Sequence, residues 1–302
     1  MQVGMIGLGR MGAGMGQRLI RAGHEVVGHA RSTRTVRQFV ESGGRGAESL
    51  QALVDALARP RALWMMIPAG EGVDRTLEQL APLLGSGDVV VDGGNSHYRD
   101  SMRRAAWMRA RGLHFVDVGT SGGVWGLSEG YCLMIGGDPE PVGRLRPLFE
   151  ALAPAPDRGW GHVGPNGAGH FVKMVHNGIE YGLMQAYAEG FAILRRANTF
   201  GLDVRQVAQI WRWGSVVRSW LLDLAARGLA EDPDLHDVAP YVEDSGEGRW
   251  AVAEAIALDT PAPVITLALL QRLRSRDAES YADRVLAMLR HQFGGHAFRR
   301  PD

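Results

Sequence analysis

The sequence predicts an α/β domain built on a doubly wound parallel sheet, followed by an all-helical domain. Short apolar runs alternate with helical segments through residues 1–164, which is typical of a parallel sheet with helices on both faces. Residues 164–167 (GPNG) are a cluster of structure breakers, and the stretch 168–198 that follows contains no proline. No β-rich run of comparable length appears beyond it. We therefore expect two domains, 1–164 and 165–302.

Individual elements follow from the periodicity of the apolar residues. In the first domain, strands are expected over 2–6, 24–28, 62–67, 88–92, 114–118 and 132–135. A helix is expected over 11–22, and further helical segments separate most of the strands, for example 33–42, 71–84 and 98–111. In the second domain, helices are expected over 168–198, 203–228, 247–258, 262–274 and 278–292. We interpret Trp211, Trp213 and Trp220 as core residues of the second domain.

A glycine-rich turn follows the first strand and opens the first helix. It has the spacing G-x-G-x-x-G and consists of Gly7, Leu8, Gly9, Arg10, Met11 and Gly12. The first glycine permits a tight bend, the second lets the backbone approach a pyrophosphate, and the third lets helix and strand pack closely. The helix N-terminus adds free N–H groups and a partial positive charge. Within a β-α-β unit, this turn predicts a Rossmann dinucleotide-binding domain.

The end of the second strand indicates which dinucleotide fits. An NAD site usually has Asp or Glu there, which binds the ribose hydroxyls. This chain has Ala30, Arg31 and Ser32 instead. Because no carboxylate repels a 2′-phosphate, and because Arg31 and Ser32 can bind it, NADP is favoured and NAD is the alternative cofactor. The competing interpretation is a solvated basic loop.

Composition excludes several other classes of function. Lys+Arg and Asp+Glu are both 33, so no overall charge indicates a nucleic-acid partner or an anionic membrane surface. No apolar run approaches the roughly 20 residues that span a bilayer, and we expect no signal peptide. The single Cys132 cannot form an internal disulfide, and we expect it to be buried. The sequence thus predicts a cytoplasmic protein, and no histidine spacing indicates a metal site.

Four polar side chains share one face of the long segment after the boundary. Lys173, His176, Asn177 and Glu180 are spaced i, i+3, i+4 and i+7, so on a helix the other three lie within about 60° of Lys173. The segment is otherwise rich in glycine and apolar residues, which argues against a solvated surface. An exposed polar stripe with a Lys–Glu pair is the alternative. The functional interpretation is a base, an acid and hydrogen-bond donors on one rigid element.

This segment, GAGHFVKMVHNGIEYG over 167–182, resembles the catalytic signature of decarboxylating 6-phosphogluconate dehydrogenases, within the β-hydroxyacid dehydrogenase superfamily. The run 92–96 (DGGNS) is similar to the substrate-contacting loop of that family, and 120–123 (TSGG) to its substrate-binding loop. Residues 248–250 (GRW) and the tail 290–296 (RHQFGGH) are similar to further family motifs. The chain is too short for the duplicated helical domain of long members, so it resembles the short form.

The resemblance implies oxidative decarboxylation of 6-phosphogluconate to ribulose 5-phosphate and CO2 with reduction of NADP or NAD, a step of the pentose phosphate pathway and of gluconate utilisation. It implies that Lys173 takes the proton of the C3 hydroxyl and that Glu180 is the general acid at C1. His176 and Asn177 would orient the substrate, and Asn95 would also lie beside the cofactor. The substrate-binding residues that it implies are Asn95, Ser121, Gly122, Gly123, His176, Asn177, Tyr181, Arg272, Arg290 and His296. Because the tail would reach the substrate of a partner subunit, a homodimer or homotetramer is expected.

One departure from the family pattern bears on the substrate phosphate. Long members have Lys and Thr where this chain has Ser245 and Glu247, and a carboxylate would repel a phosphate dianion. The departure leaves two alternatives open: other side chains compensate, or the substrate differs. A second enzymatic reading is a non-decarboxylating 3-hydroxyacid dehydrogenase, and a third is a non-catalytic NADP-binding protein. The set His176, Glu180 and Tyr181 argues against the second reading, and intact Lys173 and Glu180 argue against the third.

Overall fold

The computed structural model describes residues 1–294, 297 and 299. The chain forms two compact units, Met1–His176 and Asn177–Asp302. Their division falls inside the long helix α8 (Ala168–Arg196), beyond the breaker cluster at 164–167. The predicted domain boundary after residue 164 stays a prediction.

The first unit is built on an eight-stranded sheet with the order β3-β2-β1-β4-β5-β6-β7-β8. The strands are β1 (Gln2–Ile6), β2 (Glu25–His29), β3 (Arg45–Gly46), β4 (Ala62–Met65), β5 (Val89–Asp92), β6 (His114–Ser121), β7 (Cys132–Gly137) and β8 (Trp160–Gly164). Neighbouring strands pair in parallel except β6 and β7, which are antiparallel. The predicted α/β class is confirmed, with this exception to a wholly parallel sheet. The connection 122–131 is shorter than the dozen or so residues that a parallel crossover needs.

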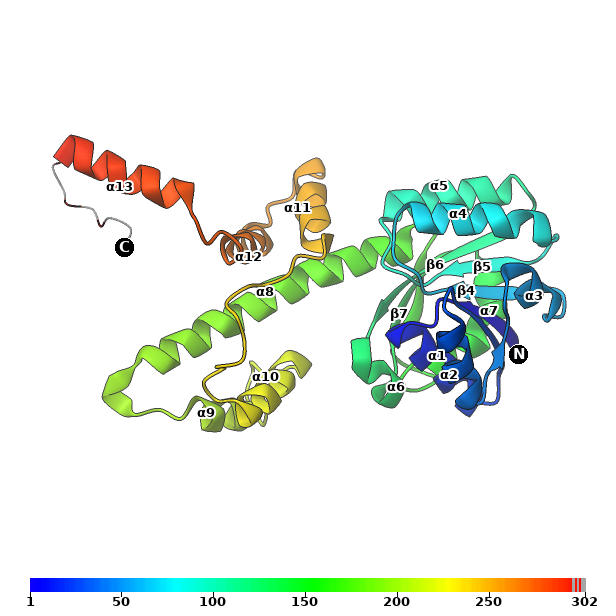
Figure 1. The fold of residues 1–302 in the computed structure, drawn as a ribbon, viewed down its shortest axis with the longest axis horizontal. Coiled ribbons are helices and arrows are strands. Elements are labelled where there is room, and N and C mark those ends of the chain that lie inside the picture. Colours follow the sequence, from blue (N-terminus) through cyan, green and yellow to red (C-terminus); the bar gives the residue numbers. More distant parts are fainter. Residues whose placement is uncertain (295–296, 298, 300–302) are drawn as a thin grey trace. The chain divides into compact units, whose positions relative to one another are not determined.

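Helices cover both faces of this sheet (Figure 1). They are α1 (Arg10–Arg21), α2 (Thr33–Glu41), α3 (Leu50–Asp55), α4 (Glu71–Leu80), α5 (Tyr98–Arg109), α6 (Gly126–Glu129) and α7 (Pro139–Leu152), with the 3-10 turns η1 (Ala81–Leu83) and η2 (Gly123–Trp125). The predicted segments 33–42, 71–84 and 98–111 correspond to α2, to α4 with η1, and to α5. No range was given from the sequence for β3, α3, α6, α7 and β8.

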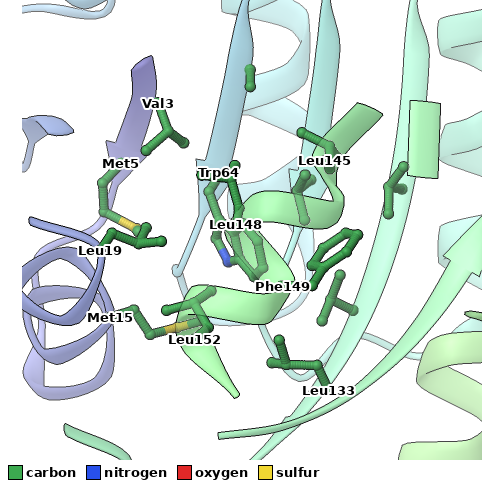
Figure 2. Packing of buried hydrophobic residues seen from close by; sticks show 14 of the residues in the cluster. Val3, Met5, Met15, Leu19, Trp64, Leu133, Leu145, Leu148, Phe149 and Leu152 are labelled. Carbon is green, nitrogen blue, oxygen red and sulfur yellow. The ribbon is translucent and has the colours of Figure 1, made fainter. Parts of the chain in front are cut away.

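Each face of the sheet has its own apolar core, because successive side chains of a strand point to opposite faces. In β5, Val89 and Val91 belong to the core beneath α1 and α7, and Val90 belongs to the core beneath α4 and α5. Figure 2 shows the first of these cores, where Trp64 of β4 lies near Phe149 of α7. Their rings meet edge to face with centroids 6.0 Å apart. The two cores hold the strand ends, and hence the loops that follow them, in fixed places.

The second unit contains helices joined by turns and loops, and no strand among its described residues, which confirms the predicted class of the second domain. After α8 its helices are η3 (Asn198–Phe200), α9 (Val204–Trp211), α10 (Trp220–Glu231), α11 (Glu247–Ala257), α12 (Pro263–Arg274) and α13 (Tyr281–Gly294). The predicted single helix over 203–228 is therefore two helices, separated by a turn in which Gly214 has a φ of +68°. Among the described residues, none of the helices combines the length and the apolar character needed to cross a membrane.

Two interpretations of burial are wrong. Trp213 and Trp220 are 75% and 45% exposed rather than core residues. Trp211 is half-buried, and its ring stacks on Phe191 at 5.9 Å between centroids. Cys132 is exposed instead of buried, because it is the first residue of β7 and lies at the sheet's end rather than in its core.

Candidate active site

The glycine-rich turn between β1 and α1 has the geometry of a phosphate-binding loop. Gly7 has a φ of +92°, and a Cβ on it would lie 2.4 Å from the carbonyl oxygen of Met66. A Cβ on Gly12 would lie 2.0 Å from the carbonyl oxygen of Gly7, so helix and strand approach as closely as the motif predicts. Beside Gly9, by contrast, no heavy atom of the described residues lies within 4 Å of such a Cβ. The N-terminus of α1 thus faces open space, and these residues fit a dinucleotide pyrophosphate.

The other predicted cofactor residues surround this turn. Leu8 is buried in the core, Met11 is half-buried and packs against it, and Arg10 is exposed at the start of α1. Ala30, Arg31 and Ser32 follow β2, which pairs with β1 in parallel, so both turns lie at the same edge of the sheet.

Arg31 and Ser32 are exposed at that edge. The Ser32 hydroxyl accepts a hydrogen bond from the N–H of Thr35 at 3.4 Å and so caps α2. Arg31 does not cap the helix, so its exposed guanidinium is the group of this turn that can bind a phosphate.

Two further loops leave the sheet at the same carboxyl edge. The loop with Asn95 follows β5, and the loop with Ser121, Gly122 and Gly123 follows β6; β5 and β6 are parallel to β1 and β4. In doubly wound sheets, ligands bind outside this edge. Asn95, Ser121 and Gly122 are half-buried, and Gly122 has a φ of +128°, a conformation that favours glycine. The fold thus brings the cofactor turn and both predicted substrate loops to one edge.

A network of buried charged and polar side chains holds the Asn95 loop in place. Asp92 is fully buried, accepts a hydrogen bond from the Ser96 hydroxyl at 2.7 Å, and lies 3.5 Å from the guanidinium of Arg104. Arg104 also forms an ion pair with Asp74 at 2.9 Å. Because the Arg104 guanidinium donates to it, the pKa of Asp74 lies below its usual value. Sequence reasoning missed Arg104, since an arginine inside an ordinary helical pattern carries no signal of burial.

Lys173 is a buried amine, with 8% of the residue exposed, and it packs against β6. A Cβ on Gly119 of that strand would lie 2.4 Å from the Lys173 Cβ, so glycine there makes room for the lysine. Its Nζ lies 3.5 Å from Nδ1 of His176, one turn further along α8. Gly119 is two residues before Ser121, so the first carbons of the Lys173 side chain pack close to the start of the predicted substrate loop.

The start of α8 is held by a buried carboxylate. The backbone N–H groups of Gly167 and His170 donate to the two oxygens of Asp117, at 2.6 and 3.0 Å. Burial raises the pKa of the Asp117 carboxyl, and the nearby His170 and these two N–H groups partly offset that effect. A helix N-terminus is a favourable place for a carboxylate. Neither Asp117 nor His170 was singled out from the sequence, although His170 lies within the signature run.

Asn177 and Glu180 follow on α8, both half-buried, and Tyr181 begins a cluster within the second unit. The Tyr181 hydroxyl lies 3.4 Å from Oγ of Ser245, and the Arg272 guanidinium lies over the Tyr181 ring, 3.6 Å from its centroid. The second unit thus places hydroxyls and a cation together, as an anion site requires.

Glu247, the residue whose charge conflicts with a phosphate, is 5% exposed at the first position of α11. Its Oε2 is buried without a hydrogen-bond partner among the described residues. The following Gly248 packs on the Tyr181 ring, where a Cβ would lie 2.4 Å from a ring carbon. The structure therefore places Glu247 beside the Tyr181 cluster rather than on the protein surface.

The predicted tail residues remain untested. Arg290 is exposed on α13, and His296 lies outside the described residues. Within the described part of the chain, no group of three or more His, Cys, Asp and Glu side chains is placed to hold a metal ion.

Comparison with known proteins identifies the family. The model for the NAD-binding domain of 6-phosphogluconate dehydrogenase matches residues 2–163, and the model for the C-terminal domain of the same enzyme matches residues 169–293. The chain belongs to the 6-phosphogluconate dehydrogenase family. The resemblance predicted from the signature run is thereby confirmed.

Relatives of two lengths share this membership. The NAD(+)-dependent, decarboxylating 6-phosphogluconate dehydrogenase of Haloferax volcanii is 45% identical over 303 residues, which cover all of both chains. The decarboxylating enzyme of Schizosaccharomyces pombe is 39% identical over 90% of this chain, but the match spans 58% of that protein. The chain thus corresponds in length to the short relative.

Solved structures agree with the fold. The 6-phosphogluconate dehydrogenase of Plasmodium falciparum, studied with NADP+ and with 6-phosphogluconate, superposes with a TM-score of 0.85 at 26% identity and covers all of this chain and 67% of that one. A 3-hydroxyisobutyrate dehydrogenase from Mycobacterium tuberculosis has a TM-score of 0.72 at 24% identity over 92% of this chain and 94% of that one. The second likeness shows the fold alone.

Proposed function

We propose that this protein catalyses the oxidative decarboxylation of 6-phosphogluconate to ribulose 5-phosphate and CO2, with reduction of NADP or NAD. One observation carries the proposal beyond family membership. The buried Lys173 packs against Gly119, two residues before Ser121, and β6 ends at the sheet edge where the dinucleotide turn also opens. A desolvated amine next to a substrate loop is suited to proton transfer, because burial disfavours its charged form.

The dinucleotide fits the turn at Gly7, Gly9 and Gly12, and the N–H groups at the start of α1 would hold its pyrophosphate. The chemistry that it supplies when bound is hydride acceptance at the nicotinamide ring. The exposed Arg31 guanidinium favours NADP, since it can bind a 2′-phosphate. NAD stays the alternative, because the Haloferax volcanii relative is NAD(+)-dependent.

The chain's own residues account for the proton transfers. Lys173, in its neutral form, takes the proton of the substrate C3 hydroxyl as C3 is oxidised. The resulting β-keto acid loses its carboxyl group as CO2, and the Lys173 ammonium then stabilises the enediol that remains. Glu180 gives a proton to C1, which completes ribulose 5-phosphate. His176, 3.5 Å from the Lys173 amine, orients the substrate with Asn177, Asn95 and Ser121.

The phosphate end of the substrate is assigned to the Tyr181 cluster. Arg272 supplies the cation, and the hydroxyls of Tyr181 and Ser245 supply hydrogen bonds. In this proposal these groups take the place of the lysine and threonine of the long members, although the buried Glu247 carboxylate lies beside the same cluster. Arg290 and His296 of a partner subunit are proposed to complete the site.

We propose that the protein forms a homodimer or homotetramer, because the second unit exposes apolar side chains. Val264, Leu267 and Leu270 on α12 are 52–67% exposed, and Leu286 and Leu289 on α13 are 60% and 48% exposed. On each helix these apolar side chains are spaced three residues apart and share one face, and exposed apolar faces favour an interface between copies of the chain. The pentose phosphate pathway and a cytoplasmic location stay predictions, the latter supported by the single cysteine.

A substrate-profile assay tests the proposed function. Reduction of NADP and of NAD is followed with 6-phosphogluconate, gluconate and 3-hydroxyisobutyrate as substrates. We expect turnover with 6-phosphogluconate and a much lower kcat/KM with the two acids that lack the phosphate. Efficient turnover of 3-hydroxyisobutyrate instead would support the non-decarboxylating alternative, and no turnover of any substrate would refute both.

A further inference from the structure

His170 is a buried histidine in the first turn of α8, three residues before Lys173, and it is 2% exposed. Both of its ring nitrogens have partners in other elements. Nε2 lies 3.1 Å from the carbonyl oxygen of Gly94, and Nδ1 lies 2.7 Å from Oγ of Ser101 on α5. The ring therefore connects the catalytic helix to the Asn95 loop.

The chemistry of the partners defines the direction of these bonds. Because a carbonyl oxygen can only accept, Nε2 carries a hydrogen and donates it to Gly94. In the neutral ring, Nδ1 then accepts the hydroxyl hydrogen of Ser101 at 2.7 Å, a shorter contact than the 3.4 Å from the same hydroxyl to the carbonyl oxygen of His97. A hydrogen bond to one ring nitrogen, such as that between Ser101 and Nδ1, fixes the tautomer and orientation of an imidazole. Ser101 thus aims the Nε2–H of His170 at the loop.

The Asn95 loop is held on both sides of Asn95. On one side, the carbonyl of Gly94 accepts from His170. On the other, the Ser96 hydroxyl donates to Asp92 at 2.7 Å and accepts from Arg104 at 3.1 Å. Asp92 and Arg104 belong to the strand and helix that flank the loop. Of these three hydrogen bonds, only the one from His170 connects the loop to α8.

We propose that His170 is a positioning residue, which fixes Asn95 relative to the Lys173 amine. The inference rests on the proposed function, in which Asn95 binds the substrate and Lys173 takes its proton. Since a misplacement of about 1 Å can cost about 10²-fold in rate, loss of the His170–Gly94 bond should lower kcat while dinucleotide affinity stays the same.

Matched variants separate positioning from packing. His170→Gln keeps an N–H donor near the place of Nε2, whereas His170→Asn keeps one only near Nδ1. Val142→Ala removes buried methyl groups from the core beneath α7 and serves as the control for a loss of stability alone. The measurements are kcat and KM for 6-phosphogluconate, the Kd of NADP, and Tm. Ser101→Ala, which leaves the ring but removes its partner, is the second test should His170→Asn not fold.

We expect kcat of His170→Asn to fall about 10²-fold, with the Kd of NADP unchanged, and His170→Gln to recover most of that loss. Ser101→Ala should lower kcat in the same direction, and Val142→Ala should lower Tm but keep kcat. If the wild type is active, any one of three results would overturn the inference. They are equal kcat in His170→Asn and Val142→Ala, equal losses of kcat in His170→Asn and His170→Gln, and an unchanged kcat in Ser101→Ala. An inactive wild type would overturn the proposed function and this inference with it.

Discussion

The guanidinium of Arg272 lies 3.6 Å from the centroid of the Tyr181 ring, and it donates to the carbonyl oxygen of Glu243 at 3.0 Å. Stacking on the ring and the hydrogen bond together hold the cation in one orientation, and its other N–H groups have no hydrogen bond to the described residues, so they can donate to a ligand. The hydroxyl of the same tyrosine lies beside Ser245. This arrangement makes Arg272 the central residue of the proposed phosphate site.

Arg272→Ala should raise KM for 6-phosphogluconate by about 10–100-fold, because a charge-assisted hydrogen bond is worth about 1.5–3 kcal/mol. Arg272→Lys should recover little, since an ammonium cannot stack as a planar guanidinium does. Arg274→Ala is the control, because Arg274 lies on the same helix but forms an ion pair with Asp283. Steady-state kinetics against 6-phosphogluconate measure the effect. An unchanged KM would place the phosphate elsewhere.

Lys173→Met should lower kcat by about 10²–10⁴-fold, the usual contribution of a general base, without weakening NADP binding. Methionine has a similar length and apolar character, so it fills the space against Gly119 without supplying an amine. Single-turnover kinetics measure the rate of the chemical step, and a fluorescence titration with NADP measures the affinity for the cofactor. Substantial residual turnover at normal affinity would mean that another group is the base.

Arg31→Ala should raise KM for NADP by about 10–100-fold and leave KM for NAD nearly unchanged, because only NADP carries the 2′-phosphate. Arg75→Ala on α4 is the matched control, since Arg75 is an exposed arginine that pairs with Glu71. Kinetics with both dinucleotides check the result. Equal effects on the two Michaelis constants would refute a role for Arg31 at the 2′-phosphate.

The two fold classes, the glycine-rich turn and the long helix could be predicted from the sequence, since glycine spacing and helical periodicity are local properties. The run 167–182 indicated both the long helix and its polar face. The buried partners of that face could not be predicted, because Asp117, Arg104 and His170 are defined by contacts between distant segments. The exposed Trp213 and Trp220 were misjudged for the same reason: apolar character alone does not say whether a neighbour covers the residue.

Asp74→Asn should destabilise the protein by about 1–3 kcal/mol at pH 7, because it removes a carboxylate partner of the buried Arg104. The pKa of Asp74 is lowered by the hydrogen bonds from Arg104, so its stabilising contribution is present above the usual Asp pKa of about 3.9 and is lost as the pH falls through the lower folded-state pKa. Denaturant unfolding of both proteins at pH 7 and toward pH 3 should show the difference shrinking.

The matched control for this prediction is Asp100→Asn, which removes an exposed partner of Arg103. An exposed ion pair contributes little, about 0–1 kcal/mol, so this variant should resemble the wild type. A difference between Asp74→Asn and the wild type that stays constant from pH 7 to pH 3 would contradict the assigned linkage.

Arg290 allows a test of the proposed sharing of sites between subunits. Arg290→Ala should raise KM for 6-phosphogluconate, and Lys173→Met should be inactive. If Arg290 acts in the partner's site, mixing and reassembling the two variants creates heterodimers with one intact site, so activity at low substrate should rise above that of either variant. Activity no higher than the average of the separate variants would place Arg290 outside the partner's site.

Release of CO2 from C1 of the substrate tests the central claim most directly. 6-Phosphogluconate labelled at C1 is incubated with the protein and NADP, and labelled CO2 is measured against the NADPH formed. The proposed function predicts equal amounts of the two products, with ribulose 5-phosphate remaining. Formation of NADPH without labelled CO2 would contradict it and show a dehydrogenase that does not decarboxylate.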